Sequence, residues 1–174
     1  LFPEQLTYIV NHAQDEVIFV DKSLMGLLAP LLPTFTTVKH LVIMDDGKGE
    51  IPADLAGIAS YDYEELLAKA APAQFVEVPE NTAASMCYTS GTTGNPKGVV
   101  YTHRSTFLHT MATMMTDGLG VSESDKILPV VPMFHANAWG LAHAAVASGA
   151  DLVMPGPDLS GPAVANLIVN ERPT

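Results

Sequence analysis

The chain has 174 residues, of which 48% are hydrophobic and 16% are charged, and its 19 acidic and 8 basic side chains give a net charge of −11. This size suits about one domain with a hydrophobic core of its own. The acidic balance and the lack of a basic cluster argue against binding to nucleic acid or to an anionic membrane surface.

The first half of the chain alternates between helical and strand patterns. Helical spacing of apolar residues predicts helices over 3–13, 22–32 and about 62–70. Short apolar runs predict buried strands over 17–20 and 40–44. This alternation predicts an α/β fold with a doubly wound, mainly parallel sheet and helices on both faces.

The second half follows a linker over 72–81 and has the same character. Strand patterns over 84–88 and 99–102 flank a glycine-rich loop, so the loop is expected to join two strands. The single cysteine, Cys87, lies in the first of these strands as a small core residue, and one cysteine excludes an internal disulfide or a cysteine zinc site. Further along we expect a helix over 103–117, a strand over 127–131, a helix over 135–148, a strand over 152–154 and a last helix from Ser160.

A long uncharged segment lies between Ile127 and Ala150, which contains no Asp, Glu, Lys or Arg. Prolines and histidines interrupt it, so a buried strand followed by a core helix explains it better than a membrane span. The start of the chain also lacks the basic and apolar regions of a signal peptide.

The segment Tyr88-Thr-Ser-Gly-Thr-Thr-Gly-Asn-Pro-Lys-Gly-Val99 combines flexible backbone, hydroxyl groups and one positive charge. Its glycines allow sharp turns that bring backbone N–H groups close to an anion: Gly91, Gly94 and Gly98. Lys97 is the only lysine or arginine between positions 69 and 104. Neutral donors come from Thr89, Ser90, Thr92 and Thr93.

This segment, the phosphate loop 88–99, matches neither the G-x-x-x-x-G-K-[ST] pattern nor G-x-G-x-x-G. A plain hairpin tip is the alternative, since Asn95-Pro96 and scattered glycines are common in turns. A plain turn, however, does not need so many hydroxyls beside a lysine. The loop therefore predicts polyphosphate binding.

A second group of residues lies in the segment 132–140, where a predicted strand gives way to a helix. Ligands in doubly wound sheets gather beyond the carboxyl ends of strands, so His135 at a helix N-terminus is placed to meet a carboxylate or phosphate. Alternatively, it caps the helix or bonds a carbonyl. Trp139, four residues on, shares its predicted helical face, and core packing is the alternative for this side chain.

Three other groups admit two interpretations. Asp45 and Asp46 form a carboxylate pair, but Gly47 beside them favours a solvated turn. His109 and His143 have no partner at metal-ligand spacing and are expected to pack or to face solvent. An apolar group on the helix over 103–117 either packs as core, which is the commoner case, or forms an adaptable wall for a ligand: Phe107, Met111, Met114 and Met115.

The phosphate loop resembles the signature of the adenylate-forming superfamily, which includes acyl-CoA synthetases, luciferases and peptide-synthetase adenylation domains. With Tyr101-Thr-His-Arg104 after it, the loop is most similar to that of fatty acyl-CoA synthetases. Phe2-Pro-Glu-Gln-Leu-Thr-Tyr-Ile-Val-Asn-His-Ala13 and Pro132-Met-Phe-His-Ala-Asn-Ala-Trp-Gly140 are similar to two other segments of those enzymes, in the same order. The resemblance identifies residues 1–174 as a single α/β subdomain from the large N-terminal domain of such a synthetase.

The resemblance implies a ligase that converts a fatty acid or related carboxylate, ATP and CoA to acyl-CoA, AMP and pyrophosphate through an acyl-adenylate. It implies catalytic roles for Lys97, Thr92 and His135, a magnesium ion at Thr89, and acyl-substrate contacts from His135 and Trp139. The ATP-binding residues that it implies are Thr89, Ser90, Gly91, Thr92, Thr93, Gly94, Lys97 and Ala136.

The chain begins at Leu1 and lacks the family's adenine motif and C-terminal lysine domain, so we expect an excerpt of a longer synthetase that is inactive alone. Alternatives are a noncatalytic nucleotide-binding module that retained the loop, and an adenylate-forming ligase for a different carboxylate. A kinase or hydrolase is disfavoured because no base motif accompanies the loop. The expected setting is cytoplasmic, with a peripheral position at a membrane through the substrate left open, as is a homodimer of the full-length protein.

Overall fold

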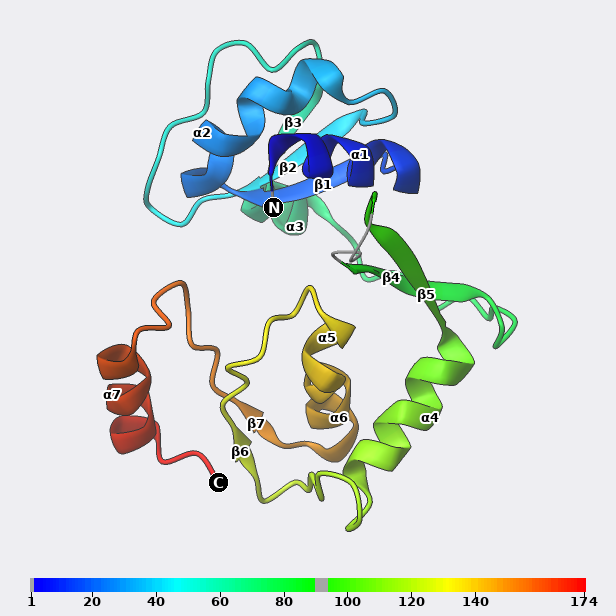
Figure 1. Ribbon diagram of the computed structural model, residues 1–174, viewed down its shortest axis with the longest axis vertical. Helices are drawn as coiled ribbons and strands as arrows, with labels where there is room; N and C mark the ends of the chain where they lie inside the picture. Colours follow the sequence, from blue (N-terminus) through cyan, green and yellow to red (C-terminus); the bar gives the residue numbers. More distant parts are fainter. Residues whose placement is uncertain (1, 90–93) are drawn as a thin grey trace. The chain divides into compact units, whose positions relative to one another are not determined.

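A computed structural model describes residues 2–89 and 94–174, and these fall into two compact units (Figure 1). The first unit consists of residues 2–76 and 94–96, and the second of residues 77–89 and 97–174. A single subdomain spanning 1–174 stays a prediction. Most strand pairs are parallel and alternate with helices, so the predicted α/β class is confirmed.

A parallel sheet organises the first unit, with its strands in the order β1–β2–β3. β1 (Val17–Asp21) and β2 (His40–Met44) are the predicted strands, and their apolar, β-branched residues favour a buried sheet. β3 (Ala59–Asp62) is not among the predicted strands. All four of its residues are exposed, so no apolar pattern predicts it. It pairs in parallel with β2, and Tyr61 Oη lies 3.3 Å from Nδ1 of His40 on that strand.

Helices cover both faces of this sheet, as predicted (Figure 1). α1 (Pro3–Ala13) begins at the predicted proline, and α3 (Tyr63–Lys69) is capped by Asp62, whose Oδ1 accepts from the Glu65 N–H at 2.8 Å. On α3's side of the sheet, Tyr63 meets Phe19 edge to face with ring centroids 6.4 Å apart. The opposite side holds the main core: Val10, Val20, Met25, Leu28, Leu32, Phe35, Val38, Leu41 and Ile43.

The helix predicted over 22–32 is broken into three pieces. These are η1 (Lys22–Leu24), α2 (Met25–Leu28) and η2 (Ala29–Thr34), of which the η segments are 3₁₀ turns. Pro30 and Pro33 supply no backbone N–H, so a continuous α-helical ladder cannot run through η2.

The second unit begins with an antiparallel hairpin of β4 (Ala83–Thr89) and β5 (Lys97–Thr102), which confirms that the phosphate loop joins two strands. α4 (His103–Met114) follows directly and packs against α6 (Leu141–Ser148). β6 (Lys126–Ile127) and β7 (Asp151–Leu152) pair in parallel, and α7 (Gly161–Glu171) starts after Ser160 as predicted.

β6 and β7 are shorter than the strands predicted over 127–131 and 152–154. Pro129 and Pro132 cannot donate to a strand ladder, so pairing stops after Ile127. The core of this unit is small, with buried Val121, Leu141 and Ala144. In the parts of the chain that the structure describes, no helix is long and apolar enough to cross a membrane.

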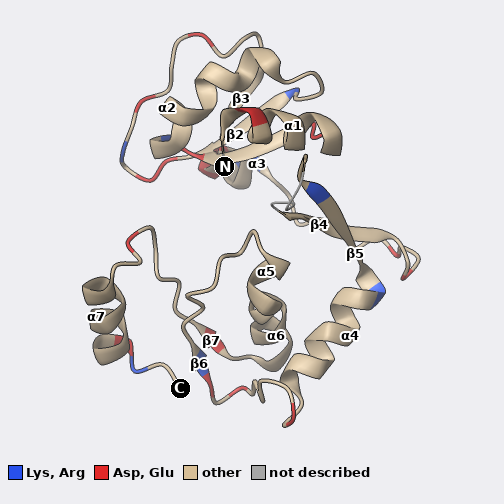
Figure 2. Ribbon diagram, in the orientation of Figure 1, with Lys and Arg blue, Asp and Glu red and all other residues tan. Residues whose placement is uncertain are grey.

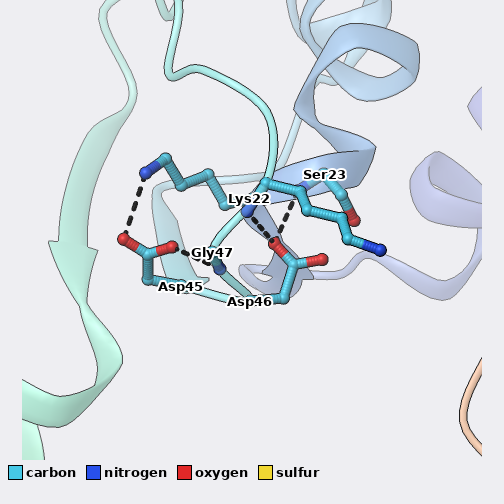
Figure 3. A network of polar contacts seen from close by, with 6 residues as sticks. Lys22, Ser23, Asp45, Asp46 and Gly47 are labelled. Atoms are coloured by element: carbon cyan, nitrogen blue, oxygen red, sulfur yellow. Dashed lines mark hydrogen bonds and ion pairs between the residues drawn. The ribbon is translucent and has the colours of Figure 1, made fainter.

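The Asp45–Asp46 pair forms the predicted turn and uses both carboxylates to join β2 to η1 (Figure 3). Asp45 Oδ1 accepts from the Gly47 N–H at 2.8 Å, and its Oδ2 meets the Lys22 ammonium at 3.0 Å. Asp46 Oδ1 accepts from the backbone N–H of Ser23 at 3.2 Å. The bond from Gly47 and the ion pair with Lys22 lower the pKa of Asp45, and hydrogen bonding from the side chain of Ser23 lowers the pKa of Asp46.

We predict that Leu41→Ala destabilises the first unit by about 2–5 kcal/mol, because a fully buried side chain leaves a cavity when truncated. Leu27→Ala is the matched control, since Leu27 on α2 is 74% exposed. Urea unfolding of the full-length protein measures both. Equal losses of stability in the two variants would contradict the core assignment.

We predict that Lys22→Met weakens the protein at neutral pH but not in acid. The lowered pKa of Asp45 means that its stabilisation is present above the ordinary carboxyl value of 3.8 and is lost as the pH falls through the folded value. Removing Lys22 raises the pKa of Asp45, so the gap in thermal midpoint between wild type and variant should close in acid. Lys48→Met is the control, because Lys48 forms no ion pair in the described parts of the chain. A difference in thermal midpoint between wild type and Lys22→Met that persists in acid would show that the effect of Lys22 does not depend on the ionisation of Asp45.

Candidate functional site

The β4–β5 hairpin holds the two ends of the phosphate loop. Its register pairs Thr89 with Lys97, and Thr89 Oγ1 donates to the Lys97 carbonyl at 3.5 Å. Directly opposed residues of an antiparallel pair project to the same face, so the hydroxyl and the ammonium start from adjacent positions. Lys97 is the only basic residue of the two strands and begins β5 (Figure 2). Both residues are exposed.

The interior of the loop is described only in part. Ser90, Gly91, Thr92 and Thr93 lie outside the described residues, so their predicted contacts stay predictions. Gly94 has φ of 104°, a conformation that residues with a Cβ rarely adopt, and this fits its predicted role in a sharp turn.

Helix α4 starts without a connecting loop after β5, and Thr102 fixes its start. Thr102 Oγ1 accepts from the Ser105 N–H at 3.1 Å, while Ser105 Oγ accepts from the Thr102 N–H at 2.9 Å. This capping box satisfies two N–H groups at the helix start. Arg104 is engaged with Glu80 through a 2.7 Å ion pair.

The helix predicted over 135–148 is wrong in its first turn. α5 (Ala136–Trp139) has φ of 47°, 51°, 50° and 59° at its four residues, so it is a left-handed turn. Gly140, with φ of 72°, ends it, and the right-handed helix α6 begins only at Leu141. The spacing predicts that His135 and Trp139 share one face of a right-handed helix. That prediction is wrong, because the turn between them is left-handed.

Both side chains are accessible in this structure. His135 has extended backbone, is exposed, and makes no capping hydrogen bond to α5, which removes the capping alternative for it. Trp139 is 53% exposed, so it is not a core residue of this unit. Trp139 lines a cavity of about 290 Å³ together with His109, Ala112, Thr113, Gly118 and Leu119.

A second cavity of about 250 Å³ contains Ala136, the residue expected to approach the adenylate. His109 and His143 also line it, although no sequence pattern predicts that they lie near Ala136. Tertiary packing brings the two histidines together, because His109 lies on α4, His143 lies on α6, and these helices pack side by side. The cavity is lined by Ser85, Tyr101, Ser105, Thr106, His109, Ala136, Asn137, Gly140 and His143.

Helix α4 buries a different face from the one predicted. Thr110 and Thr113 are buried, and their hydroxyls donate to the carbonyls of Thr106 and His109 at 2.8 and 2.9 Å. The side chains expected as core are instead exposed, apart from partly buried Met114: Phe107, Met111 and Met115. The hydroxyls can be buried because the helix's own carbonyls satisfy them.

Two side chains from other elements contact the left-handed turn. The Cys87 thiol of β4 donates to Asn137 Oδ1 at 2.8 Å, and His109 Nε2 of α4 lies 2.9 Å from the Trp139 carbonyl oxygen. Cys87 lies two residues before Thr89 on the same strand. The hairpin that carries the phosphate loop and the turn that follows His135 are therefore in direct contact.

Known proteins resemble this chain over nearly its whole length. It is 49% identical over 168 residues to the 3-methylmercaptopropionyl-CoA ligase of Ruegeria lacuscaerulensis, covering 97% of this chain and 31% of the relative. It is 46% identical over 172 residues to the medium-chain-fatty-acid–CoA ligase of Ectopseudomonas oleovorans, covering 98% and 31%. The chain thus spans about a third of the length of these relatives.

The fold also has a solved counterpart. The anthranilate CoA ligase AuaEII, in a crystal structure with anthranoyl-AMP, superposes with a TM-score of 0.77 at 22% identity, covering 100% of this chain and 32% of that one. The family model described as AMP-binding enzyme matches residues 1–174. The chain therefore belongs to the AMP-binding enzyme family.

Proposed function

We propose that the full-length protein is an AMP-forming acyl-CoA synthetase for a fatty acid or a related carboxylate. The observation that carries the proposal is the contact of the two motifs in one unit, where the Cys87–Asn137 hydrogen bond joins the phosphate-loop hairpin to the turn after His135. Relatives named as CoA ligases at 46–49% identity support the same reaction. A carboxylate and an ATP tail would then meet between these two elements.

In the proposed reaction a carboxylate oxygen attacks the α-phosphorus of ATP, forming acyl-AMP and releasing pyrophosphate. The thiolate of CoA then attacks the acyl carbon, and AMP leaves with the electrons of the broken C–O bond. In the first step the protein's task is to stabilise the charge on the leaving pyrophosphate.

Lys97 is proposed to neutralise the β- and γ-phosphates. The hydroxyls and N–H groups of the loop would hold the phosphate oxygens, through Ser90, Gly91, Thr92, Thr93 and Gly94. A magnesium ion, when bound, would supply further positive charge there. The exposed hydroxyl of Thr89 fits it, since Mg²⁺ keeps several waters and takes few protein oxygens.

His135, Ala136 and Trp139 are proposed to form the acyl and adenylate side of the site. The exposed imidazole of His135 and the cavity at Ala136 support this assignment. We further propose a cytoplasmic enzyme that approaches membranes only through its substrate, and a homodimer of the full-length protein.

We predict that Lys97→Ala in the full-length protein lowers kcat for pyrophosphate release about 100- to 1,000-fold, because the leaving group loses its counter-charge. Lys69→Ala is the matched control, since Lys69 forms only an exposed ion pair with Glu65 on α3. A coupled pyrophosphate assay with ATP, Mg²⁺, CoA and a fatty acid measures both. Wild-type turnover by Lys97→Ala would remove the loop from the mechanism.

We predict that Trp139→Ala changes the preference among acids of different length, while KM for ATP stays constant. Loss of the indole removes apolar contact area, so kcat/KM for the longer acids should fall roughly 10- to 100-fold more than for short ones. Pyrophosphate release across short, medium, long and aromatic acids gives the profile. Val146→Ala is the control, because Val146 on α6 is 85% exposed. An unchanged profile would exclude Trp139 from the acyl site.

A further inference from the structure

The left-handed turn at 136–140 runs against the intrinsic preference of its residues. Left-handed helical backbone costs roughly 1–2 kcal/mol per residue with a Cβ, and here four such residues adopt it in succession. Elsewhere in the described residues, positive φ at non-glycine positions occurs only singly, at Gln14, Ala56 and Arg172. Tertiary contacts must therefore select this conformation.

Hydrogen bonds within the turn close it but do not explain its hand. The Ala138 N–H donates to the His135 carbonyl at 3.1 Å, and the Gly140 N–H donates to the Asn137 carbonyl at 3.0 Å. Similar i to i+3 bonds form in right-handed turns, which the sequence would otherwise favour. The contacts that distinguish the two hands must come from outside the turn.

His109 supplies one such contact with two parts. Its Nε2 lies 2.9 Å from the Trp139 carbonyl oxygen, and since a carbonyl only accepts, Nε2 carries the donated proton. Its ring also lies against Gly140, where an added Cβ would fall 2.6 Å from the His109 Cδ2 atom. The imidazole thus fits only a glycine at position 140 and a carbonyl in this orientation.

Cys87 supplies the other contact, in the middle of the turn. Its thiol donates to Asn137 Oδ1, and asparagine is among the few residues that tolerate left-handed backbone. The turn is therefore held from β4 at Asn137 and from α4 at Trp139.

We propose that His109 and Cys87 are positioning residues that hold the turn 136–140 in its left-handed form, and so place His135 and Trp139 for the acyl substrate. This role rests on the function proposed above. Neither residue needs to touch substrate, because both act through the backbone and side chain of the turn. Three residues of the turn wall the 250 Å³ cavity: Ala136, Asn137 and Gly140.

The first test compares His109→Ala with His109→Gln in the full-length protein. Loss of one hydrogen bond should raise KM for the acid about 3- to 10-fold, while KM for ATP stays within about twofold. His109→Gln keeps a side-chain N–H and should recover most of the loss. His103→Ala is the control, since His103 is exposed at the start of the same helix. Equal changes in both KM values, or no recovery in His109→Gln, would overturn the positioning role.

Cys87 is tested by the same split. Cys87→Ser keeps a hydroxyl donor for Asn137 and should stay close to wild type, whereas Cys87→Ala should raise KM for the acid about 3-fold. Equal values for the serine and alanine variants would show that the thiol's hydrogen bond does not position the turn.

A double-mutant cycle between His109 and Gly140 tests the contact itself. Gly140→Ala alone adds a Cβ that collides with the imidazole, but in a His109→Ala background only the backbone strain remains. The loss of kcat/KM caused by Gly140→Ala should therefore be at least about 3-fold smaller in that background. Additive effects on kcat/KM and on thermal midpoint would overturn the positioning role of His109 but would not contradict the proposed function. A wild-type protein that releases no pyrophosphate with any acid would instead overturn the proposed function, and the positioning role with it.

Discussion

Antiparallel pairing of β4 with β5 is the interaction on which the rest of the candidate site depends. Its register puts Thr89 opposite Lys97 and so fixes both ends of the phosphate loop. The same hairpin aims Cys87 at Asn137, and its second strand runs straight into α4, which carries His109. A change of one residue in this register would move every side chain of one strand to the opposite face. The hairpin would then no longer hold the phosphate loop, the turn after His135 and α4 in their present positions relative to one another.

The first unit is organised around a buried apolar core. Its parallel strands bury Leu41 and Ile43 against α1, α2 and η2, while α3 covers the other face through Tyr63. Polar contacts there serve the backbone: Asp45 and Asp46 close the turn after β2 and tie it to η1. In the second unit most of the polar side chains around the 250 Å³ cavity at Ala136 are uncharged, and its buried apolar core is small. The apolar side chains that stabilise the first unit are therefore different from the polar side chains that surround the candidate site in the second unit.

Sequence patterns predicted the elements that depend mainly on residues close together in the sequence. Apolar spacing after Pro3 gave α1, the β-branched run 40–44 gave β2, and the glycine–hydroxyl–lysine pattern gave a loop between two strands. The failures are equally specific. All residues of β3 are exposed, so no apolar pattern in the sequence predicted this strand. The left-handed turn at Ala136–Gly140 is selected by Cys87 and His109, which lie far away in sequence, and α4 buries threonines whose hydroxyls are satisfied by carbonyls that no apolar pattern reveals.

The bond between His109 and the Trp139 carbonyl has a further property that follows from imidazole chemistry. Because Nε2 must carry the proton that it donates, the neutral ring is the Nε2–H tautomer and Nδ1 keeps a lone pair. One hydrogen bond therefore sets both the direction of the Trp139 carbonyl and the tautomer of the histidine that holds it.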